Sequence, residues 1–146
     1  MESNLNQHLC FNFYRGWREI SSFYKDVLGN DVSPQNVYIL ELCELDRKIT
    51  MNELSNAMHL DGSAVSTLIS RMEKKSLVVR EHGVKDRRVV YVKLTKEGHE
   101  FRESLRSQMD ALTDNATQNI SKNDITALQA MVNKVAKNRA NYKESL

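Results

Sequence analysis

The sequence predicts a mainly α-helical fold of about six helices that includes one small β-hairpin. A single Pro and five Gly among 146 residues are typical of a mostly helical chain. Apolar residues recur with a helical period along most of the chain, but residues 77–94 contain two β-branched runs around Gly83. The length suits one ordinary domain with a buried core, so we expect residues 1–146 to form a single domain.

Two helices are predicted in the first third of the chain. Apolar residues repeat with a helical period over residues 5–28, and Gly29 ends this helix. Ser33 and Pro34 are the favoured pair at the start of a helix, so a second helix begins there. Its inner residues are expected to be Val37, Leu40 and Cys43.

The next two helices are short and are separated by a tight turn. Thr50 and Glu53 match a capping box, which predicts a third helix of barely two turns. Its inner residues are expected to be Leu54, Ala57 and Met58. Asp61 then caps a fourth helix over residues 62–75, whose apolar residues fall at i, i+3, i+4 and i+7 and must point inward. They are Val65, Leu68, Ile69 and Met72.

The opposite face of the fourth helix carries small and hydroxyl side chains and one arginine. Hydroxyls and a guanidinium can donate to base edges and phosphates, and short side chains let a helix approach a groove closely. An ordinary solvated helix face would more typically be rich in Glu and Lys. This face is therefore predicted to contact DNA through Ser63, Ala64, Ser66, Thr67, Ser70 and Arg71.

The predicted hairpin pairs residues 77–81 with residues 89–94, and its loop is basic. From Arg71 to Lys93 there are eight basic and three acidic residues, a local charge of +5 in a chain of +2, so the remainder carries −3. Such a concentration is the electrostatic footprint expected for nucleic acid. Beside two short helices the loop forms a wing, which makes residues 33–95 a winged helix-turn-helix. The wing residues expected to contact DNA are Lys85, Asp86, Arg87 and Arg88.

Two long amphipathic helices are predicted after the hairpin. Thr95 caps a fifth helix and Ser121 a sixth, and both have long apolar stripes for which the central unit leaves little core. We expect residues 1–30 and 96–146 to interleave with a second copy in a twofold homodimer, which would read a pseudo-palindromic DNA site. Packing within a monomer is the alternative.

The sequence also excludes several function classes. His8, His59, His82 and His99 are scattered and the cysteines lack ligand spacing, so we expect no metal site. We expect no cofactor and no enzyme activity, since a phosphate loop and a Ser-His-Asp set are absent from the sequence. The polar opening, residues 1–7, argues against a signal peptide, and no apolar run is long enough for a membrane span. Two cysteines fit a reducing cytoplasm.

Essentially the whole chain resembles the MarR family of winged helix-turn-helix regulators. The resemblance rests on Leu60–Ser66, on Arg71–Lys75, and on Asp86-x-Arg88 followed by Leu94-Thr95. It implies a transcriptional regulator, expected to be a repressor, whose Arg88 enters the minor groove while Asp86 braces it. Ser76 departs from the glycine usual after the recognition helix, a position that often needs a left-handed backbone.

A narrower resemblance concerns the first helix. Cys10-Phe11-x-x-Tyr14, with Tyr24 further along, is similar to the organic-hydroperoxide-sensing (OhrR-like) branch of this family. It implies that Cys10 is oxidised and that Tyr14 and Tyr24 bind its thiolate across the dimer interface. No cysteine follows Cys43, which is expected to be inert packing, so the implied partner of oxidised Cys10 is a low-molecular-weight thiol.

Four other interpretations stay open at this point. Cys10 can be a small buried hydrophobe and the two tyrosines core aromatics. DNA binding can instead be released by a small aromatic or phenolic ligand held between the dimerisation and DNA-binding regions. A thiol peroxidase using Cys10, and a helical protein whose basic hairpin binds an acidic partner, are the alternatives from other classes.

Overall fold

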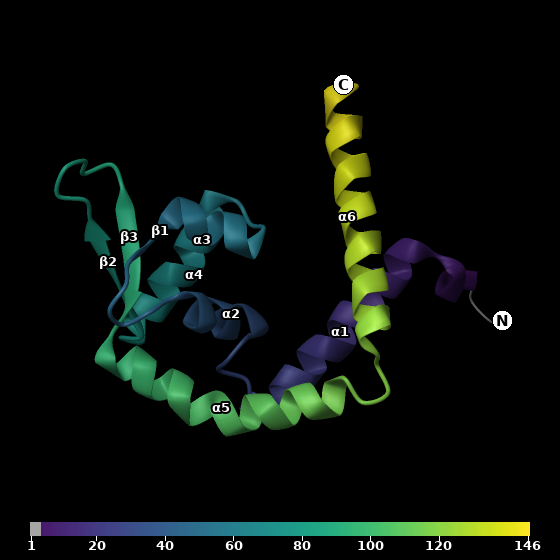
Figure 1. Ribbon diagram of the computed structural model, residues 1–146, viewed down its shortest axis with the longest axis horizontal. Helices are drawn as coiled ribbons and strands as arrows, with labels where there is room; N and C mark the ends of the chain where they lie inside the picture. Colours follow the sequence, from purple (N-terminus) through teal and green to yellow (C-terminus); the bar gives the residue numbers. More distant parts are fainter. Residues whose placement is uncertain (1–3) are drawn as a thin grey trace. The chain divides into compact units, whose positions relative to one another are not determined.

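The computed structural model describes residues 4–146, so the first three residues of the predicted polar opening lie outside the described part. Residues 4–112 form one compact unit and residues 113–146 a second, and each is described by itself. The elements are η1 (Asn4–Gln7), α1 (Leu9–Leu28), α2 (Pro34–Leu42), β1 (Ile49–Thr50), α3 (Met51–Met58), α4 (Gly62–Lys74), β2 (Val78–His82), β3 (Val90–Leu94), α5 (Lys96–Ala116) and α6 (Lys122–Glu144). The expected six α-helices and the hairpin are confirmed, and Figure 1 shows them in order.

The helix starts follow the predicted caps. Ser33 and Thr50 each accept a hydrogen bond from the backbone N–H three residues on, and that residue's side chain accepts one in return. Ser121 forms the same capping box with Asp124. Asp61 accepts from the backbone N–H of Ala64 at 2.8 Å. Since each cap acts within four residues, sequence alone was sufficient to place these four starts.

The predicted first helix over residues 5–28 is wrong at its beginning. Asn4–Gln7 form a separate 3₁₀ turn, and His8 is extended with φ −89° and ψ 129° before α1 starts at Leu9. The side chain of His8 makes no capping hydrogen bond, so nothing in the local sequence marks this break.

The sheet has three strands rather than the two that the sequence predicts. Its order is β1-β3-β2 and both pairings are antiparallel. Val78 pairs with Leu94 at one end of the hairpin and His82 with Val90 at the other, so the strands lie close to the predicted ranges 77–81 and 89–94. The missed strand, β1, is Ile49–Thr50, and Ile49 pairs with Val92. Two residues are too few to show the apolar/polar alternation of a strand, so only the pairing with β3 identifies β1.

The core lies between the sheet and helices α2, α3 and α4, which Figure 1 shows gathered beside the strands. The buried cluster comprises Ile39, Leu40, Cys43, Leu54, Val65, Ile69, Met72, Val78, Val92, Leu94 and Leu105. One expectation is wrong, because Ala57 is exposed, whereas Met58 and Leu68 are partly buried and pack against the cluster. The predicted burial of Cys43 is confirmed, and burial raises the pKa of its thiol to about 12.

The junction between the hairpin and α5 is closely packed. The backbone N–H of Gly98 donates to Oγ1 of Thr95 at 2.9 Å, and that hydroxyl donates to the carbonyl of Ser76. A Cβ on Gly98 would collide with the carbonyl of Leu77. These contacts hold the first turn of α5 against Ser76 and Leu77, the residues that follow α4 in the sequence.

The terminal helices leave their apolar faces uncovered. On α1 only Tyr24 is buried, and α6 contains no buried residue. The exposed apolar side chains on these helices are Leu9, Tyr14, Trp17, Ile20, Phe23, Ile125, Leu128, Met131, Val132, Val135 and Tyr142. No helix among residues 4–146 is both long and apolar enough to cross a membrane.

Candidate nucleic-acid interface

The outer face of α4 presents three exposed side chains at helical spacing, Ser63, Thr67 and Arg71. The hydroxyl of Ser63 donates to Oδ1 of Asp61 at 2.8 Å, and the hydroxyl of Thr67 donates to the carbonyl of Ser63 at 3.0 Å. Hydrogen bonds from the Ala64 N–H and then from Ser63 lower the pKa of Asp61, which is therefore a charged cap. These hydrogen bonds fix the first turn of α4 next to its exposed face.

Three other predicted contact residues of α4 are less exposed than the sequence suggested. Ala64, Ser66 and Ser70 are only partly accessible, although the pattern places them on the outward face. For the two serines the physical reason is Arg80 of β2, whose guanidinium lies against them. It donates to the hydroxyls of Ser66 and Ser70, each at 3.0 Å.

Arg80 is the site residue that the sequence reasoning missed. It was counted only as one of the local positive charges, but it also pairs with Glu73 at 2.6 Å and donates to the carbonyl of Ser66 at 2.7 Å. Its side chain is 25% exposed. A lone basic residue inside a β-branched run was the available signal, since a half-buried guanidinium needs acceptors nearby.

The wing places Arg88 and Asp86 together, as the resemblance implied. Oδ1 of Asp86 accepts from the backbone N–H of Arg88 at 3.0 Å and from its Nε at 3.1 Å, while Oδ2 accepts from Nη2 at 3.1 Å. These bonds lower the pKa of Asp86, with the Arg88 side chain as the largest cause. The Arg88 side chain remains 92% exposed, so it is held by one carboxylate and otherwise free to enter a groove.

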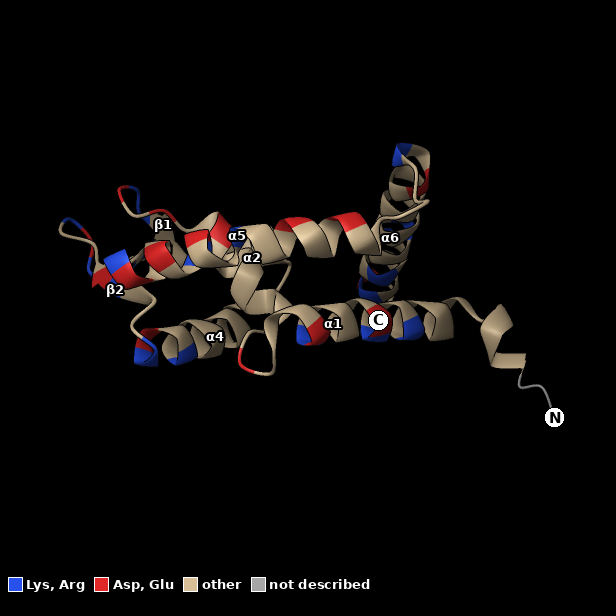
Figure 2. Cartoon of the chain, turned by 90° about the horizontal axis from the view of Figure 1, so that it is seen from below, with Lys and Arg blue, Asp and Glu red and all other residues tan. Residues whose placement is uncertain are grey.

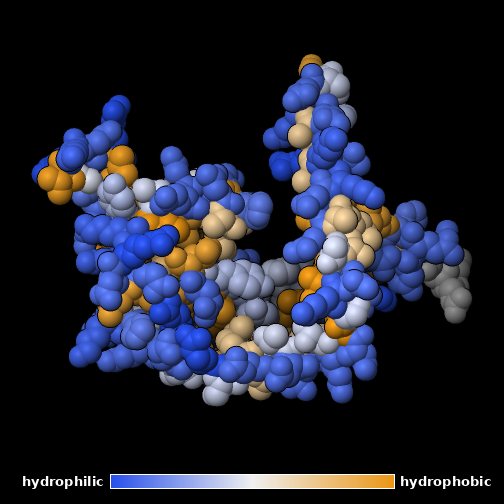
Figure 3. Space-filling view, viewed as in Figure 1, coloured by the Kyte–Doolittle hydropathy of each residue, from blue (hydrophilic) through white to orange (hydrophobic). Residues whose placement is uncertain are grey.

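The tip of the wing is also partly apolar. Val84 is 98% exposed, and Figure 3 shows an apolar patch at this tip. The loop is closed by the backbone N–H of Gly83, which donates to the carbonyl of Val89 at 2.8 Å. Lys85 and Arg87 are exposed in the same loop.

Ion pairs reduce the predicted positive charge both in the wing loop, where Arg88 pairs with Asp86, and away from it. Arg80 pairs with Glu73, and Lys93 pairs with Glu81 at 3.0 Å. Figure 2 shows the remaining Lys and Arg residues on the loop and at the C-terminal end of α4. Five of them form no ion pair within residues 4–146, namely Arg71, Lys74, Lys75, Lys85 and Arg87. The surface thus keeps a cationic strip for phosphates.

The three predicted redox residues all lie on α1, but they do not meet within one chain. Cys10 is exposed in the first turn, and Tyr14 is 54% exposed, with its hydroxyl accepting from Arg18 at 3.2 Å. Tyr24 is buried and its hydroxyl donates to that of Tyr38 at 3.5 Å. Burial, and then this hydrogen bond, raise the pKa of Tyr24. Fourteen residues of helix separate Cys10 from Tyr24 by about 21 Å.

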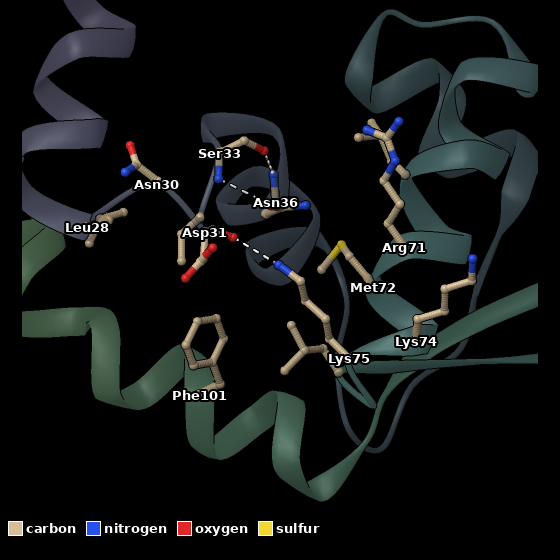
Figure 4. A pocket seen from close by; sticks show the side chains of 13 residues that line it. Leu28, Asn30, Asp31, Ser33, Asn36, Arg71, Met72, Lys74, Lys75 and Phe101 are labelled. Carbon is tan, nitrogen blue, oxygen red and sulfur yellow. Dashed lines mark hydrogen bonds between the residues drawn. The ribbon is translucent and has the colours of Figure 1, made fainter.

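A cavity of about 890 Å³ lies beside the start of α2 and the C-terminal half of α4. Figure 4 shows Phe101 of α5 on one side and the cations Arg71 and Lys74 on the other. The Lys75 side chain extends across the cavity, and its Nζ donates to the carbonyl of Asp31 at 3.0 Å. Among residues 4–146 there is no cluster of three His, Cys, Asp or Glu residues that could hold a metal ion.

A short helix, a second helix with a polar outer face and a basic β-loop beside it together define a winged helix-turn-helix protein that binds DNA. The family model described as MarR family matches residues 30–89. The regulator SarZ of Staphylococcus epidermidis is 30% identical over 135 residues, which cover 90% of this chain and 91% of SarZ. The regulator MgrA of Staphylococcus aureus is 26% identical, with 92% and 91% covered.

This chain belongs to the MarR family and is a DNA-binding transcriptional regulator, as its relatives are. Solved structures show the same fold. PcaV of Streptomyces coelicolor, in complex with its natural ligand, has a TM-score of 0.81 at 14% identity, with 94% of this chain and 97% of PcaV covered. A mutant MarR from E. coli, complexed with operator DNA, has a TM-score of 0.74 at 20% identity, with 92% and 99% covered.

Proposed function

We propose that this chain is a repressor that binds a pseudo-palindromic operator as a homodimer and is released when Cys10 is oxidised. The observation that carries the proposal is an exposed thiol, Cys10, on α1, a helix whose apolar side chains are largely uncovered. Chemistry at this position would act directly on the surface that a second copy covers.

The exposed apolar side chains of α1 and α6 support the homodimer. Trp17 is 46% exposed, and Leu128 of α6 is 53% exposed. Apolar side chains left uncovered along a helix face commonly mark an interface. A twofold dimer would present two copies of α4 to two half-sites and two wings to the flanking minor grooves.

Contacts to DNA are proposed for both parts of the winged unit. On α4 the contact residues are Ser63, Ala64, Ser66, Thr67, Ser70 and Arg71, in the major groove. On the wing the proposed contact residues are Lys85, Arg87 and Arg88, and Asp86 acts by orienting Arg88. Steep salt dependence of operator binding would distinguish this role from binding of the basic hairpin to an acidic protein.

The proposed oxidation is a two-electron reaction at sulfur. The Cys10 thiolate attacks the terminal oxygen of an organic hydroperoxide, the O–O bond breaks and the alcohol leaves, so sulfur is oxidised to sulfenic acid while the peroxide is reduced. A low-molecular-weight thiol then displaces water to form a mixed disulfide. Phenolic O–H groups stabilise an anion, and Tyr14 and Tyr24 of a second copy are the proposed donors, for which Tyr24 would exchange its bond to Tyr38.

Substitution of Cys10 tests this trigger. In gel-shift titrations on DNA upstream of the protein's own gene, Cys10→Ser should bind as the wild type does but should no longer be released by cumene hydroperoxide. The matched control is Cys43→Ala, because Cys43 is buried with a pKa raised to about 12, and this variant should still be released. Unchanged release of Cys10→Ser would refute the thiol mechanism.

A second candidate function is release by a small aromatic or phenolic ligand, with Cys10 structural. The cavity of about 890 Å³, lined by Phe101 and by the cations Arg71 and Lys75, favours it. The structural relative PcaV is described in complex with its natural ligand. Release of Cys10→Ser by a phenolic acid such as 4-hydroxybenzoate, without an oxidant, would support this candidate over the first.

A further inference from the structure

We infer that Arg80 turns Ser66 and Ser70 into preferential hydrogen-bond donors on α4, so that these serines select operator positions that present acceptors. The inference rests on the proposed placement of α4 in the major groove. It concerns the direction of two hydroxyl protons, which decides which bases a serine can read.

Arg80 donates to both serine oxygens and uses one lone pair of each. Nη2 donates to the hydroxyl of Ser66 at 3.0 Å and Nη1 to the hydroxyl of Ser70 at 3.0 Å. Further bonds from the same two nitrogens to the Ser66 carbonyl, at 2.7 Å, and to Glu73, at 2.6 Å, hold the guanidinium in place. A guanidinium has no acceptor, so neither serine can donate to it.

The protons of these hydroxyls are consequently left for another partner. Within residues 4–146, neither Ser66 nor Ser70 donates a side-chain hydrogen bond. The other hydroxyls of α4 behave differently, since Thr67 donates to the carbonyl of Ser63, and Ser63 donates to Asp61. Of the four hydroxyls of α4, two therefore have free protons and two have protons engaged within the helix.

A serine of unconstrained orientation can read either a donor or an acceptor, because its hydroxyl offers both. One lone pair of each oxygen already accepts a charge-assisted bond, and the adjacent guanidinium repels a second donor, so donation of the hydroxyl proton is favoured. The groups that accept in the major groove are purine N7, guanine O6 and thymine O4, together with phosphate oxygens, whereas adenine and cytosine amino groups donate. Ser66 and Ser70 should thus favour the former.

Double-mutant cycles on the full-length protein test this assignment. An operator is selected by the wild type from a random duplex library, and its acceptors are then removed singly with 7-deazapurines, 2-aminopurine for guanine, 5-methyl-2-pyrimidinone for thymine, and methylphosphonates. Ser66→Ala and Ser70→Ala should each weaken binding about 3- to 10-fold. Each loss should vanish when one particular acceptor is already missing. Thr67→Val, whose hydroxyl is engaged within α4, should show no such coupling.

Two substitutions of Arg80 separate orientation from simple folding. Lysine has only donors, so Arg80→Lys should keep the coupling, whereas Arg80→Gln offers a carbonyl oxygen to which the serines can donate and should abolish it. Thermal melting reports whether either variant folds. Losses that are uniform over all acceptors, or coupling that survives in Arg80→Gln, would overturn the inference. Failure of the wild type to select any operator would instead overturn the proposed function.

Discussion

At the scale of single residues, the wing is arranged before DNA is present. Asp86 accepts three hydrogen bonds from Arg88, one from its backbone and two from its side chain. A side chain that is already ordered loses less conformational entropy on binding. Asp86 therefore restricts the conformations of the Arg88 side chain before DNA binds.

Removing Arg88 should weaken DNA binding without weakening the fold. The side chain is 92% exposed, so Arg88→Ala should leave the free energy of unfolding unchanged to within about 0.5 kcal/mol. Operator affinity measured by fluorescence anisotropy should fall about 10- to 100-fold. Asp86→Asn should cause a smaller loss, because the cation is kept and only its orientation is relaxed. Equal affinities for Arg88→Ala and wild type would remove the wing from the interface.

At the scale of elements, the end of α4 carries the departure noted in the sequence. Ser76 has a φ of 60°, in the left-handed region that the position was expected to need. Its backbone N–H donates to the carbonyl of Glu73 at 2.8 Å, and its carbonyl accepts from Thr95. The turn is therefore retained by backbone bonds although a β-carbon makes this conformation unfavourable.

Restoring the glycine should stabilise this turn. Because a left-handed backbone costs a residue with a β-carbon about 1–2 kcal/mol, and the added freedom of glycine when unfolded offsets part of it, Ser76→Gly should gain up to about 1 kcal/mol. Urea unfolding measures the change. Ser55→Gly, inside α3, is the matched control and should lose about 0.5 kcal/mol. A loss in both variants would show that the Ser76 turn is not strained.

At the scale of the whole molecule, the uncovered faces of the terminal helices predict a dimer. Leu128→Glu should convert the protein to a monomer in sedimentation equilibrium, and should weaken operator binding, since paired half-sites would no longer be engaged together. Thr126→Glu, on the opposite side of α6, should leave the dimer intact. Both positions are exposed in the single chain, so folding of the chain should be retained in each. A dimeric Leu128→Glu would place the interface elsewhere.

Stability of the whole chain should fall at acidic pH. Hydrogen bonds to backbone N–H groups at helix starts lower the pKa of Glu53, Asp61 and Asp124, and ion pairing with Lys48 and Lys93 lowers that of Glu81. A lowered folded-state pKa means that the stabilisation is complete above the ordinary value and is lost as pH falls through the lower one. The melting temperature should therefore decrease as the pH falls below 4.5, the ordinary pKa of glutamate.

Asp61→Asn provides the control for this acid sensitivity. Asparagine caps a helix about as well as aspartate but does not titrate, so its melting temperature should decline less steeply between neutral and acidic pH. Identical profiles for the variant and the wild type would show that the charged cap contributes nothing to the pH dependence.

The sequence by itself determined the features that act over a few residues. The caps at Ser33, Thr50, Asp61 and Ser121 placed the helices, and alternating β-branched residues placed the hairpin. The bracing of Arg88 by Asp86 also follows from near neighbours. Such interactions are local, so they can be read from spacing.

Only the tertiary structure decided the contacts between distant segments. It added β1 to the sheet, and it joined Tyr24 to Tyr38 across 14 residues. It also placed Arg80 against two serines of α4 that the helical pattern had left outward. These pairings depend on which elements pack side by side, and local propensity carries no information about that choice. If α4 contacts DNA as proposed, its recognition is therefore set partly from β2.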